Sequence, residues 1–515
     1  MSALLLGIDI GTSSSKGVLT TATGAIVARA ERGHVTSNPR PGFFEHDADA
    51  VWWRDFTTLC AELRAAAGTR MIAGVGVSGI GPCLLPADAD GTPQRQAILY
   101  GVDSRAGAQI DELNAELGAT EIRRIGGSPL TSQALGPKLR WLAQVEPAVY
   151  AGTEKFFSAS NYLVYRLTGR YVLDHHSASQ CTPLYDLTSQ RWHEEWAGRI
   201  APGLALPQLR WPNELAGVVT ADAAAATGLP EGTPVTTGTI DAWAEATSVG
   251  VTHPGDVMVM YGTTMFLIQV TKDIASHPGL WSTTGVWPGS YTLAAGMATS
   301  GSITEWLAGL LGSDFATLTA EASASTAGAN GLVLLPYFAG ERTPLFDPRA
   351  RGGVLGLTLA HTRGDLYRAV LEATAFGVRH NLDTMAEATG GRREDRRLVA
   401  VGGGTQAELW PKLVSDVTGL AQEVATETIG ACLGDCLLAG VATGSARELQ
   451  QWNPIVSTIV PDAGSRATYD RRYADYLELY RVSADIAHRL AADQEASAAL
   501  VGHRSPAHED SLGGG

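Results

Sequence analysis

Near the start of the chain, the segment Asp9-Ile10-Gly11-Thr12-Ser13-Ser14-Ser15-Lys16 joins a carboxylate at a strand end to a turn of small residues. The N–H groups and hydroxyls of such a turn can surround a phosphate. The segment is not a P-loop, because that motif is G-x-x-x-x-G-K-[ST] leading into a helix and this turn leads into a strand. The alternative interpretation is a polar hairpin turn without chemistry.

A second segment repeats this arrangement at the start of the second half of the chain. Tyr261-Gly262-Thr263-Thr264 follows the strand-like residues 257–261 and precedes another apolar run, 265–270. Because the arrangement occurs twice, phosphate binding is favoured over a purely structural role for both segments.

Asp241 and the pair Asp103 and Arg105 are further candidates, since each follows an apolar run. In Gly238-Thr239-Ile240-Asp241-Ala242, small neighbours leave one carboxylate where a base could approach a substrate, although an Asp in a turn is often structural. For Asp103-Ser104-Arg105, which follows residues 97–102, the alternative is an ion pair that fixes its own loop.

Other suggestive patterns do not support a site. Gly74-Val75-Gly76-Val77-Ser78-Gly79 has the letters of the dinucleotide fingerprint, but these glycines lie inside a strand rather than before a helix. His175-His176 and His193-Glu194-Glu195 lack the spacing of H-E-x-x-H and are expected in loops. The cysteines Cys432 and Cys436 are expected to be buried packing residues of a helix.

The elements that must position these residues form two similar series. Strands are expected at residues 3–10, 16–21, 25–30, 71–77 and 234–237, and again at 257–261, 265–270 and 398–401. Thr362 with Asp365, and Thr405 with Glu408, are predicted capping boxes, the second directly after the turn Gly402-Gly403-Gly404. Both series are typical of α/β domains.

The composition limits the class of protein. A chain of 515 residues, 45% hydrophobic and 18% charged, is long for one domain, so two α/β domains are expected. A net charge of −15 without a basic stripe disfavours nucleic acid as a partner. Five cysteines without metal-ligand spacing, no signal peptide and no long apolar segment predict a cytoplasmic protein without a membrane partner.

Taken in order, these motifs resemble the FGGY family of carbohydrate kinases, in the actin-like superfamily. The match runs over residues 4–444, and its most specific parts are GIDIGTSSSKGVL at 7–19, the segment at 336–377 that begins PYFAGERTPLFDP, and VAVGGGTQAELWPKLVSDVTG at 399–419. The resemblance implies two domains, each a five-stranded ribonuclease H-like sheet with helices, and a cleft between them that holds ATP and sugar. The sugar-binding domain is expected at 1–250 and the nucleotide-binding domain at 251–494. Residues 495–515 are expected to be a disordered tail.

The resemblance also assigns roles. Asp9 is expected to orient Mg²⁺, and Asp241 to be the catalytic base that also contacts the sugar. The expected ATP-binding residues are Thr12, Ser13, Gly262, Thr263, Gly402, Gly403 and Gly404, with Lys16 either neutralising phosphate charge or solvated. Asp103 and Arg105 match a motif near the sugar, and Gly81 and Pro82 belong to the expected sugar wall.

One departure bears on the substrate. Many xylulose kinases have Gln-Met-His after Ser-Gly, whereas this chain has Ile80-Gly81-Pro82. Glu341-Arg342-Thr343-Pro344 nonetheless resembles the xylulose kinase branch, so an ATP-dependent kinase of a pentulose, such as xylulose or ribulose, or of a related polyol is expected, with a homodimer as one assembly. The alternatives are an ATPase switch of the same superfamily and a sugar sensor without catalysis.

Overall fold

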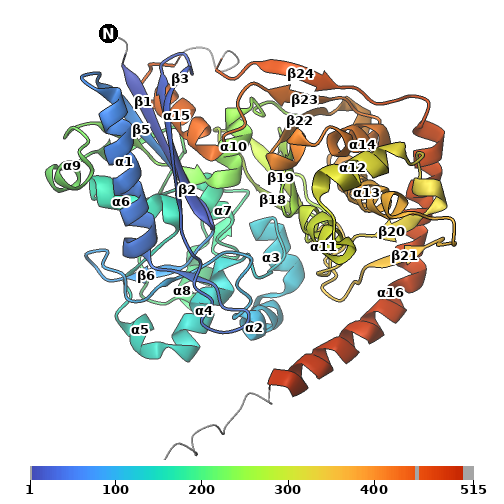
Figure 1. Cartoon of the computed structure of the whole chain (residues 1–515). Helices are drawn as coiled ribbons and strands as arrows, with labels where there is room; N and C mark the ends of the chain where they lie inside the picture. Colours follow the sequence, from blue (N-terminus) through green and yellow to red (C-terminus); the bar gives the residue numbers. More distant parts are fainter. Residues whose placement is uncertain (1–2, 447–451, 503–515) are drawn as a thin grey trace, which may run out of the picture.

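The computed structural model of the chain describes residues 3–446 and 452–502, which form two halves, each built on one sheet (Figure 1). The first sheet has the order β13 (Leu215–Val218), β14 (Pro234–Thr236), β5 (Ile72–Gly79), β1 (Leu4–Ile10), β2 (Ser14–Thr21) and β3 (Ile26–Gly33), with β15 (Thr239–Ile240) also beside β5. The second has the order β18 (Trp281–Thr284), β19 (Tyr291–Met297), β17 (Met265–Thr271), β16 (Asp256–Tyr261), β22 (Arg397–Val401), β23 (Gln422–Ala425) and β24 (Ile455–Ile459).

In the described residues each sheet has seven strands rather than the five expected, because short strands extend its edges, and the two sheets share a plan at their centres. β1 is antiparallel to β2 and parallel to β5, and β16 is antiparallel to β17 and parallel to β22. The predicted hairpins at 11–14 and 262–264 are therefore confirmed as equivalent turns. The strand expected at 97–102 is shorter than predicted, because only β7 (Ala97–Ile98) pairs, with β4 (Glu45–His46).

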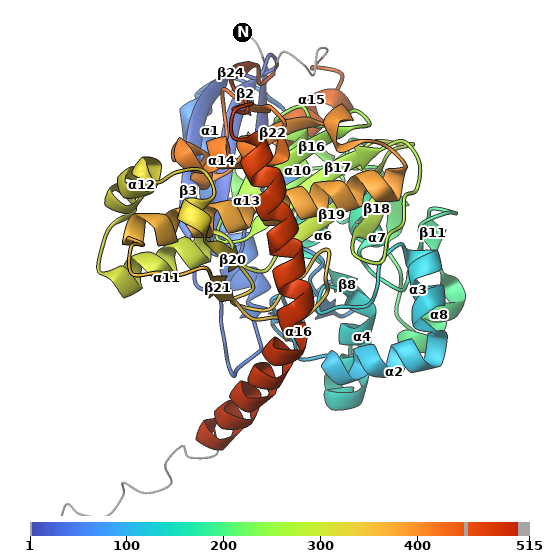
Figure 2. The same ribbon diagram turned by 90° about the vertical axis from the view of Figure 1, so that its right-hand side faces the viewer.

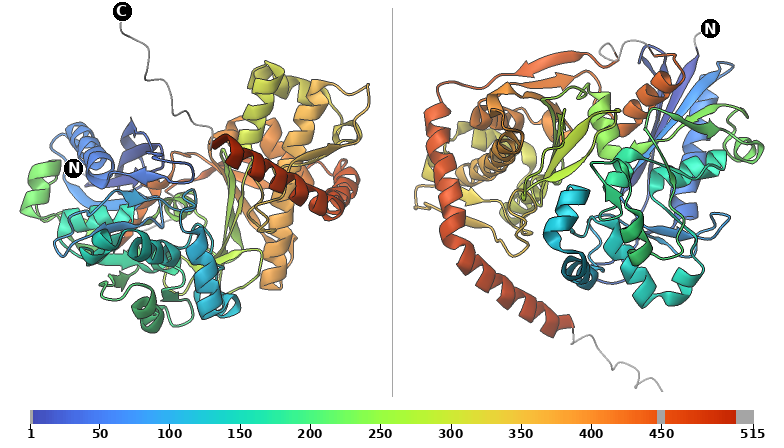
Figure 3. Two further views of the ribbon diagram at one scale, coloured as in Figure 1. Left: turned by 90° about the horizontal axis from the view of Figure 1, so that it is seen from below. Right: turned by 180° about the vertical axis from the view of Figure 1, so that it is seen from behind.

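Helices cover both sheets. In the first half, α1 (Arg54–Ala67) packs on β2 and β3, and α6 (Ala159–Thr168) packs on β5. In the second half, α13 (Arg363–Thr389) packs on β17 and β19 and against α14 (Leu409–Thr418). Seen from below, the two halves lie side by side (Figure 3).

The remaining helices and short strands complete the two halves. The helices are α2 (Gly107–Leu117), α3 (Ala119–Gly126), α4 (Leu135–Val145), α5 (Pro147–Ala151), α7 (His175–Ser179), α8 (Glu194–Ile200), α9 (Ala221–Thr227), α11 (Gly301–Leu311) and α12 (Phe315–Ala324). The strands are β6 (Leu85–Ala87), β8 (Lys155–Phe157), β9 (Val172–Asp174), β10 (Tyr185–Asp186), β11 (Arg191–Trp192), β12 (Gln208–Arg210), β20 (Val333–Leu335) and β21 (Gly353–Leu355).

One helix from the last quarter of the sequence packs on the first sheet. α15 (Ala431–Ala442) contacts β1 and β5, and it also packs against α10 (Asp241–Ser248). A Cβ at Gly7 would lie 2.0 Å from the Cys432 carbonyl, and one at Gly76 would lie 2.1 Å from the Asp435 carbonyl. Gly7 of β1 and Gly76 of the fingerprint-like segment thus allow close packing of α15, and Cys432 and Cys436 are buried as expected.

The two predicted capping boxes have different outcomes. Thr362 and Asp365 form theirs at the start of α13, as expected. The one at Thr405 and Glu408 is wrong: residues 403–406 form a short 3₁₀ turn, and α14 begins only at Leu409 without a side-chain cap. The reason is that the Thr405 hydroxyl donates instead to the Gly402 carbonyl, at 2.7 Å.

A long helix, α16 (Arg466–Gly502), runs along the outside of the second half and projects beyond it (Figure 2). Of the tail expected to be disordered, residues 495–502 belong to this helix, and 503–515 lie outside the described residues.

None of the helices in the described part of the chain is long and apolar enough to cross a membrane.

Candidate active site

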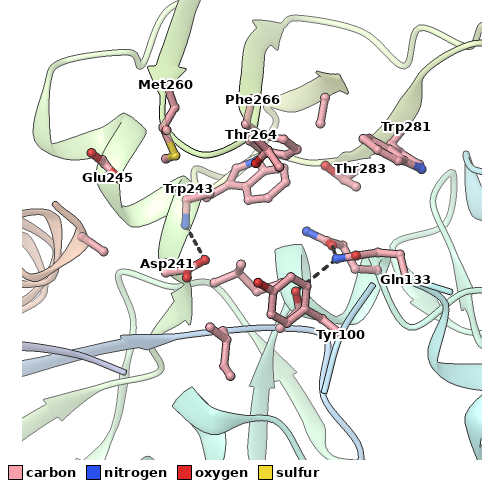
Figure 4. Close-up of a pocket in the computed structure, with 18 of the residues that line it drawn as sticks. Tyr100, Gln133, Asp241, Trp243, Glu245, Met260, Thr264, Phe266, Trp281 and Thr283 are labelled. Carbon is pink, nitrogen blue, oxygen red and sulfur yellow. Dashed lines mark hydrogen bonds between the residues drawn. The ribbon is translucent and has the colours of Figure 1, made fainter. Parts of the chain in front are cut away.

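A cavity of about 520 Å³ lies between the two halves, and both line it (Figure 4). The volume is in the range of small-molecule sites. The first half contributes Asp9, Lys16, Ile80, Gly81, Tyr100, Gln133, Gln180, Asp241, Trp243 and Glu245, among others, and the second contributes Met260, Gly262, Thr264, Phe266, Trp281, Thr283, Arg342, Gly402, Gly403 and Gly430.

Three carboxylates share one wall of this cavity: Asp9 near the end of β1, and Asp241 and Glu245 one turn apart on α10. Burial raises the pKa of Asp241 to about 6. Burial and the charge of Asp241 raise the pKa of Glu245 to about 7 and hold the pKa of Asp9 well above its usual range. The charge of Lys16 lowers the pKa of Asp9 and of Glu245, but by less than burial raises it. A bound cation would therefore stabilise the ionised carboxylates of this wall.

Asp241 is brought to the cavity by β15, whose Ile240 pairs in parallel with Gly79 of β5. The residue was expected in a turn and is instead the first residue of α10. Its Oδ1 accepts the N–H of Ala242 at 2.7 Å, and its carboxylate lies between Trp243 and Tyr100 in Figure 4. A buried carboxylate with a raised pKa is well suited to accept a proton from a bound hydroxyl.

The two small-residue hairpins occupy equivalent places in opposite halves, and each is closed by a backbone hydrogen bond from its glycine. The Gly11 N–H donates to the Ser14 carbonyl at 3.0 Å, and the Gly262 N–H donates to the Thr264 carbonyl at 3.2 Å. Gly262 and Thr264 line the cavity on either side of Thr263. Thr12 and Ser13 do not line it themselves, but the Thr12 hydroxyl lies 2.9 Å from the Tyr100 hydroxyl, which does.

The glycine triplet sits at the edge of the same cavity, where Gly402 and Gly403 line it. Gly402 has φ of +91°, and a Cβ there would lie 2.5 Å from the Tyr261 carbonyl. A Cβ at Gly404 would lie 2.8 Å from the Trp410 ring, whereas one at Gly403 would meet open space. The first and third glycines are thus required by packing, and the second leaves room beside the cavity.

Asp103 and Arg105 do not line the cavity. Their side chains are fully buried and pair with each other, with Arg105 Nη2 2.7 Å from Asp103 Oδ2. Arg105 also lies 2.8 Å from Glu45, and Asp103 accepts the Phe44 N–H at 2.7 Å. Asp103 and Arg105 therefore form the ion pair that was their alternative interpretation, and this pair holds its own loop in place. Of the other two expected sugar-wall residues, Gly81 lines the cavity and Pro82 does not.

Polar groups that the sequence did not indicate supply the cavity wall near Gly81. Gln133 donates to the Gly81 carbonyl at 3.2 Å, and the Gln180 amide donates to His176 Nε2 at 2.8 Å. His176 in turn donates from Nδ1 to the Thr284 carbonyl of the second half at 2.8 Å, and burial lowers its pKa to about 3. His176 therefore belongs to α7 and to the site surroundings rather than to a loop.

Aromatic rings form another wall that the sequence did not predict. The ring centroids of Trp243 and Phe266 are 5.8 Å apart, and those of Phe266 and Trp281 are 6.4 Å apart (Figure 4). His176 packs on Trp243 with centroids 3.9 Å apart. The indole N–H of Trp281 is buried without a hydrogen-bond partner in the described chain, so this wall combines apolar faces with a free donor. Isolated aromatic residues carry no local motif, so only the fold could identify them.

The carboxylate wall is consistent with a cation held together with a phosphate ligand. Among the described residues, no group of three or more His, Cys, Asp or Glu side chains is arranged to hold a metal by itself. Mg²⁺ is commonly bound by one or two carboxylates plus phosphate oxygens and water. Asp9, buried beside Asp241 and facing the cavity, has the chemistry for one such ligand.

Comparison with known proteins places the whole described core in one family. The family model for the N-terminal domain of FGGY carbohydrate kinases matches residues 4–248, and the model for the C-terminal domain matches residues 257–443. A glycerol kinase from Nocardia farcinica (strain IFM 10152) is 31% identical over 463 residues, covering 86% of this chain and 91% of the relative. A xylulose kinase from Escherichia coli (strain K12) is 29% identical over 488 residues, covering 93% of this chain and 99% of the relative.

A solved structure shares the arrangement of both halves. The crystal structure of xylulose kinase from Rhodospirillum rubrum superposes with a TM-score of 0.86 at 32% identity, over 94% of this chain and 100% of that one. The expected actin-like, two-domain α/β fold is thereby confirmed. Because both glycerol kinases and xylulose kinases are among the relatives, the family is confirmed but the sugar is not determined.

Proposed function

Because the chain belongs to the FGGY family of carbohydrate kinases, we propose that it transfers the γ-phosphate of ATP to a hydroxyl of a pentulose, such as xylulose or ribulose, or of a related polyol. The observation that carries this proposal is the position of Asp241. Its buried carboxylate, with a pKa of about 6, lies in a cavity lined by the phosphate-type hairpin of the second half and by polar groups of the first.

In the proposed reaction, Asp241 accepts the proton of the sugar hydroxyl as its oxygen attacks the γ-phosphorus. The bond from phosphorus to the β-phosphate oxygen breaks, and ADP leaves with that electron pair. The main demand on the protein is positioning and charge compensation. The hairpin amides at Thr12, Ser13 and Thr263 and the Lys16 ammonium would supply these for the phosphates, with the glycine triplet beside the adenosine.

Mg²⁺, when bound with ATP, would neutralise phosphate charge. Asp9 would hold it, and the raised pKa of Asp9 would fall once a cation lies beside the carboxylate. Until then, Asp9, Asp241 and Glu245 repel one another in a buried wall, which favours binding of the nucleotide and the cation together.

The side chains of the cavity support a small polyhydroxylated substrate. Gln133 and Gln180 offer amide groups where the Gln-Met-His of many xylulose kinases is replaced by Ile80-Gly81-Pro82. Trp243 and Trp281 offer flat apolar faces to the carbon skeleton. Relatives that act on xylulose and on glycerol support a pentulose or polyol, and the changed wall supports a substrate other than D-xylulose.

The two alternatives are less well supported. An actin-like ATPase switch does not need a base beside a polar sugar-sized wall, yet Asp241 and Gln133 line one cavity. A sensor without catalysis would be expected to lose one of the reactive groups, but Asp9, Asp241 and the second hairpin line the cavity, and the first hairpin is retained in the chain beside Tyr100.

A panel of ketoses, polyols and sugar acids, each incubated with the protein, ATP and Mg²⁺, tests the proposal. ADP formation must depend on one sugar and be matched by an equal amount of sugar phosphate, identified by mass spectrometry. ADP formation independent of any sugar would favour the ATPase switch, and sugar binding without turnover would favour the sensor.

A further inference from the structure

Two buried histidines, His34 and His46, pack against each other beside the first hairpin, with ring centroids 5.1 Å apart, and neither lines the cavity. His34 Nδ1 lies 2.8 Å from Asp55 Oδ2, and Nε2 lies 3.2 Å from the Gly11 carbonyl. Both ring nitrogens thus lie within hydrogen-bond distance of an oxygen atom that can accept. Asp55 is itself buried, with only 4% of its side chain exposed.

His46 has different partners, and these define which of its ring nitrogens carries the hydrogen. Its Nδ1 accepts the indole N–H of Trp52 at 3.0 Å, which leaves the hydrogen on Nε2 to be donated to the Thr36 hydroxyl at 3.0 Å. Thr36 then donates to the Thr12 carbonyl at 2.7 Å. Burial and the charge of His34 lower the pKa of His46 to about 4, in agreement with a neutral ring.

Together these groups hold three successive carbonyls of the hairpin. The His34 ring binds the Gly11 carbonyl, Thr36 binds the Thr12 carbonyl, and the His34 backbone N–H binds the Ser13 carbonyl at 2.9 Å. In a trans peptide the carbonyl and the following N–H point in opposite directions. The N–H groups of Thr12, Ser13 and the next residue therefore point away from the histidine side.

The first two of these amides remain available. Within the described residues, the N–H groups of Thr12 and Ser13 donate to no other group of the chain. Consecutive free amides in a turn form an anion-binding nest. The peptide orientation that creates this nest is imposed by His34 and Thr36, whose contacts lie on the other side of the backbone.

We propose that His34, with Thr36, is a positioning residue for nucleotide binding. Its ring locks the first hairpin so that the amides of Thr12 and Ser13 face the nucleotide phosphates, although His34 itself touches no ligand. The inference rests on the proposed function, since that function identifies the bound anion as a nucleotide phosphate.

The test compares nucleotide and sugar binding in His34→Gln and Thr36→Val. Gln can reach only one of the two acceptors, and Val keeps the shape of Thr without its donor. By calorimetry in the presence of Mg²⁺, the Kd for ADP should rise about 10-fold in His34→Gln and several-fold in Thr36→Val. The KM for ATP should rise alike, while the sugar KM changes less than about 3-fold.

His175→Gln is the matched control, because His175 is also bonded to an oxygen, that of Tyr185 at 2.9 Å, but lies outside the cavity wall. Its Kd for ADP should equal that of the parent. Parent-like ADP binding by folded His34→Gln, or equal losses for ADP and sugar with a lower Tm, overturns the inference while leaving the kinase proposal intact. If His34→Gln does not fold, the Kd of Thr36→Val for ADP decides the question. If the parent protein binds no ADP, both this inference and the kinase proposal are overturned.

Discussion

Asp241 and Glu245 lie on successive turns of α10, and both carboxylates line the cavity (Figure 4). Burial gives Asp241 a pKa of about 6, and burial with the charge of Asp241 gives Glu245 a pKa of about 7. Both values lie close to neutral pH, so either carboxylate could exchange a proton there. Because Asp241 and Glu245 are one turn apart in the same cavity, they form a natural pair for substitution.

Asp241→Asn should lower kcat by roughly 10²-fold to 10⁴-fold, the usual contribution of a positioned general base. Asn keeps the shape and can still accept the Ala242 N–H, so the Tm and sugar affinity should be retained. Glu245→Gln, one turn away, should lower kcat less than about 10-fold. Steady-state kinetics and thermal melting of both variants check this, and turnover of Asp241→Asn within a few-fold of the parent would remove Asp241 from the mechanism.

The pH dependence of kcat/KM for the sugar should show an acid limb. A base must be deprotonated to act, so activity should decline as pH falls through about 6, the pKa of Asp241 in the free protein. Each pH unit below that point should reduce kcat/KM about 10-fold. Rates measured between pH 5 and 9 with both ATP and sugar well below their KM values, where the free protein predominates, test this, and a profile that stays flat down to pH 5 would contradict the assignment.

The free energy of unfolding should decrease as pH rises, partly because of Glu341. Burial raises its pKa to about 8, although the Ala298 and Arg342 N–H groups donate to it. The folded state then binds the Glu341 proton more tightly than the unfolded state does. The resulting stabilisation is fully present below about pH 4.5, the ordinary pKa of the group, and is lost progressively as pH rises to about 8. The loss is at most about 1.4 kcal/mol per pH unit. Urea unfolding of Glu341→Gln between pH 5 and 9 should show a shallower slope, and an unchanged slope would exclude Glu341 as a source.

Gly403→Val should weaken ATP binding more than sugar binding while leaving the fold intact. A Cβ at Gly403 meets open space, and the residue lines the cavity, so the new side chain would occupy room beside the nucleotide. The neighbouring Gly402→Ala should instead lower the Tm, because φ is +91° and the Tyr261 carbonyl is 2.5 Å away. Calorimetry with ATP and thermal melting separate the two, and unchanged ATP affinity in folded Gly403→Val would argue against the adenosine site.

D-xylulose should be a poor substrate relative to the best sugar of the panel. The chain has Ile80-Gly81-Pro82 where many xylulose kinases have Gln-Met-His, and a hydroxyl left unpaired in a closed site costs roughly 1 to 3 kcal/mol. That cost corresponds to a loss of about 5-fold to 150-fold in kcat/KM. If D-xylulose has the highest kcat/KM of the panel, the amides of Gln133 and Gln180 do not redirect specificity as proposed.

The sequence by itself was sufficient for the two hairpins, the repeated strand order and the family. Small residues next to apolar runs form a local pattern, and patterns of this kind depend on neighbours within a few positions along the chain. Asp9, the turn at Gly11 and the turn at Gly262 could therefore be identified before any tertiary contact was known. The capping box at Thr362 was correct for the same reason.

Tertiary structure alone decided which distant groups share the site and which candidates do not. Asp103 and Arg105 became candidates because they follow an apolar run and match a family motif, but they pair with each other in the interior and do not line the cavity. Gln133, Trp281 and His34 carry no motif, because their roles come from segments that are far apart in the sequence and meet only after folding. Peptide orientation, burial and the pKa values that follow from burial depend on the surrounding packing, which no local pattern specifies.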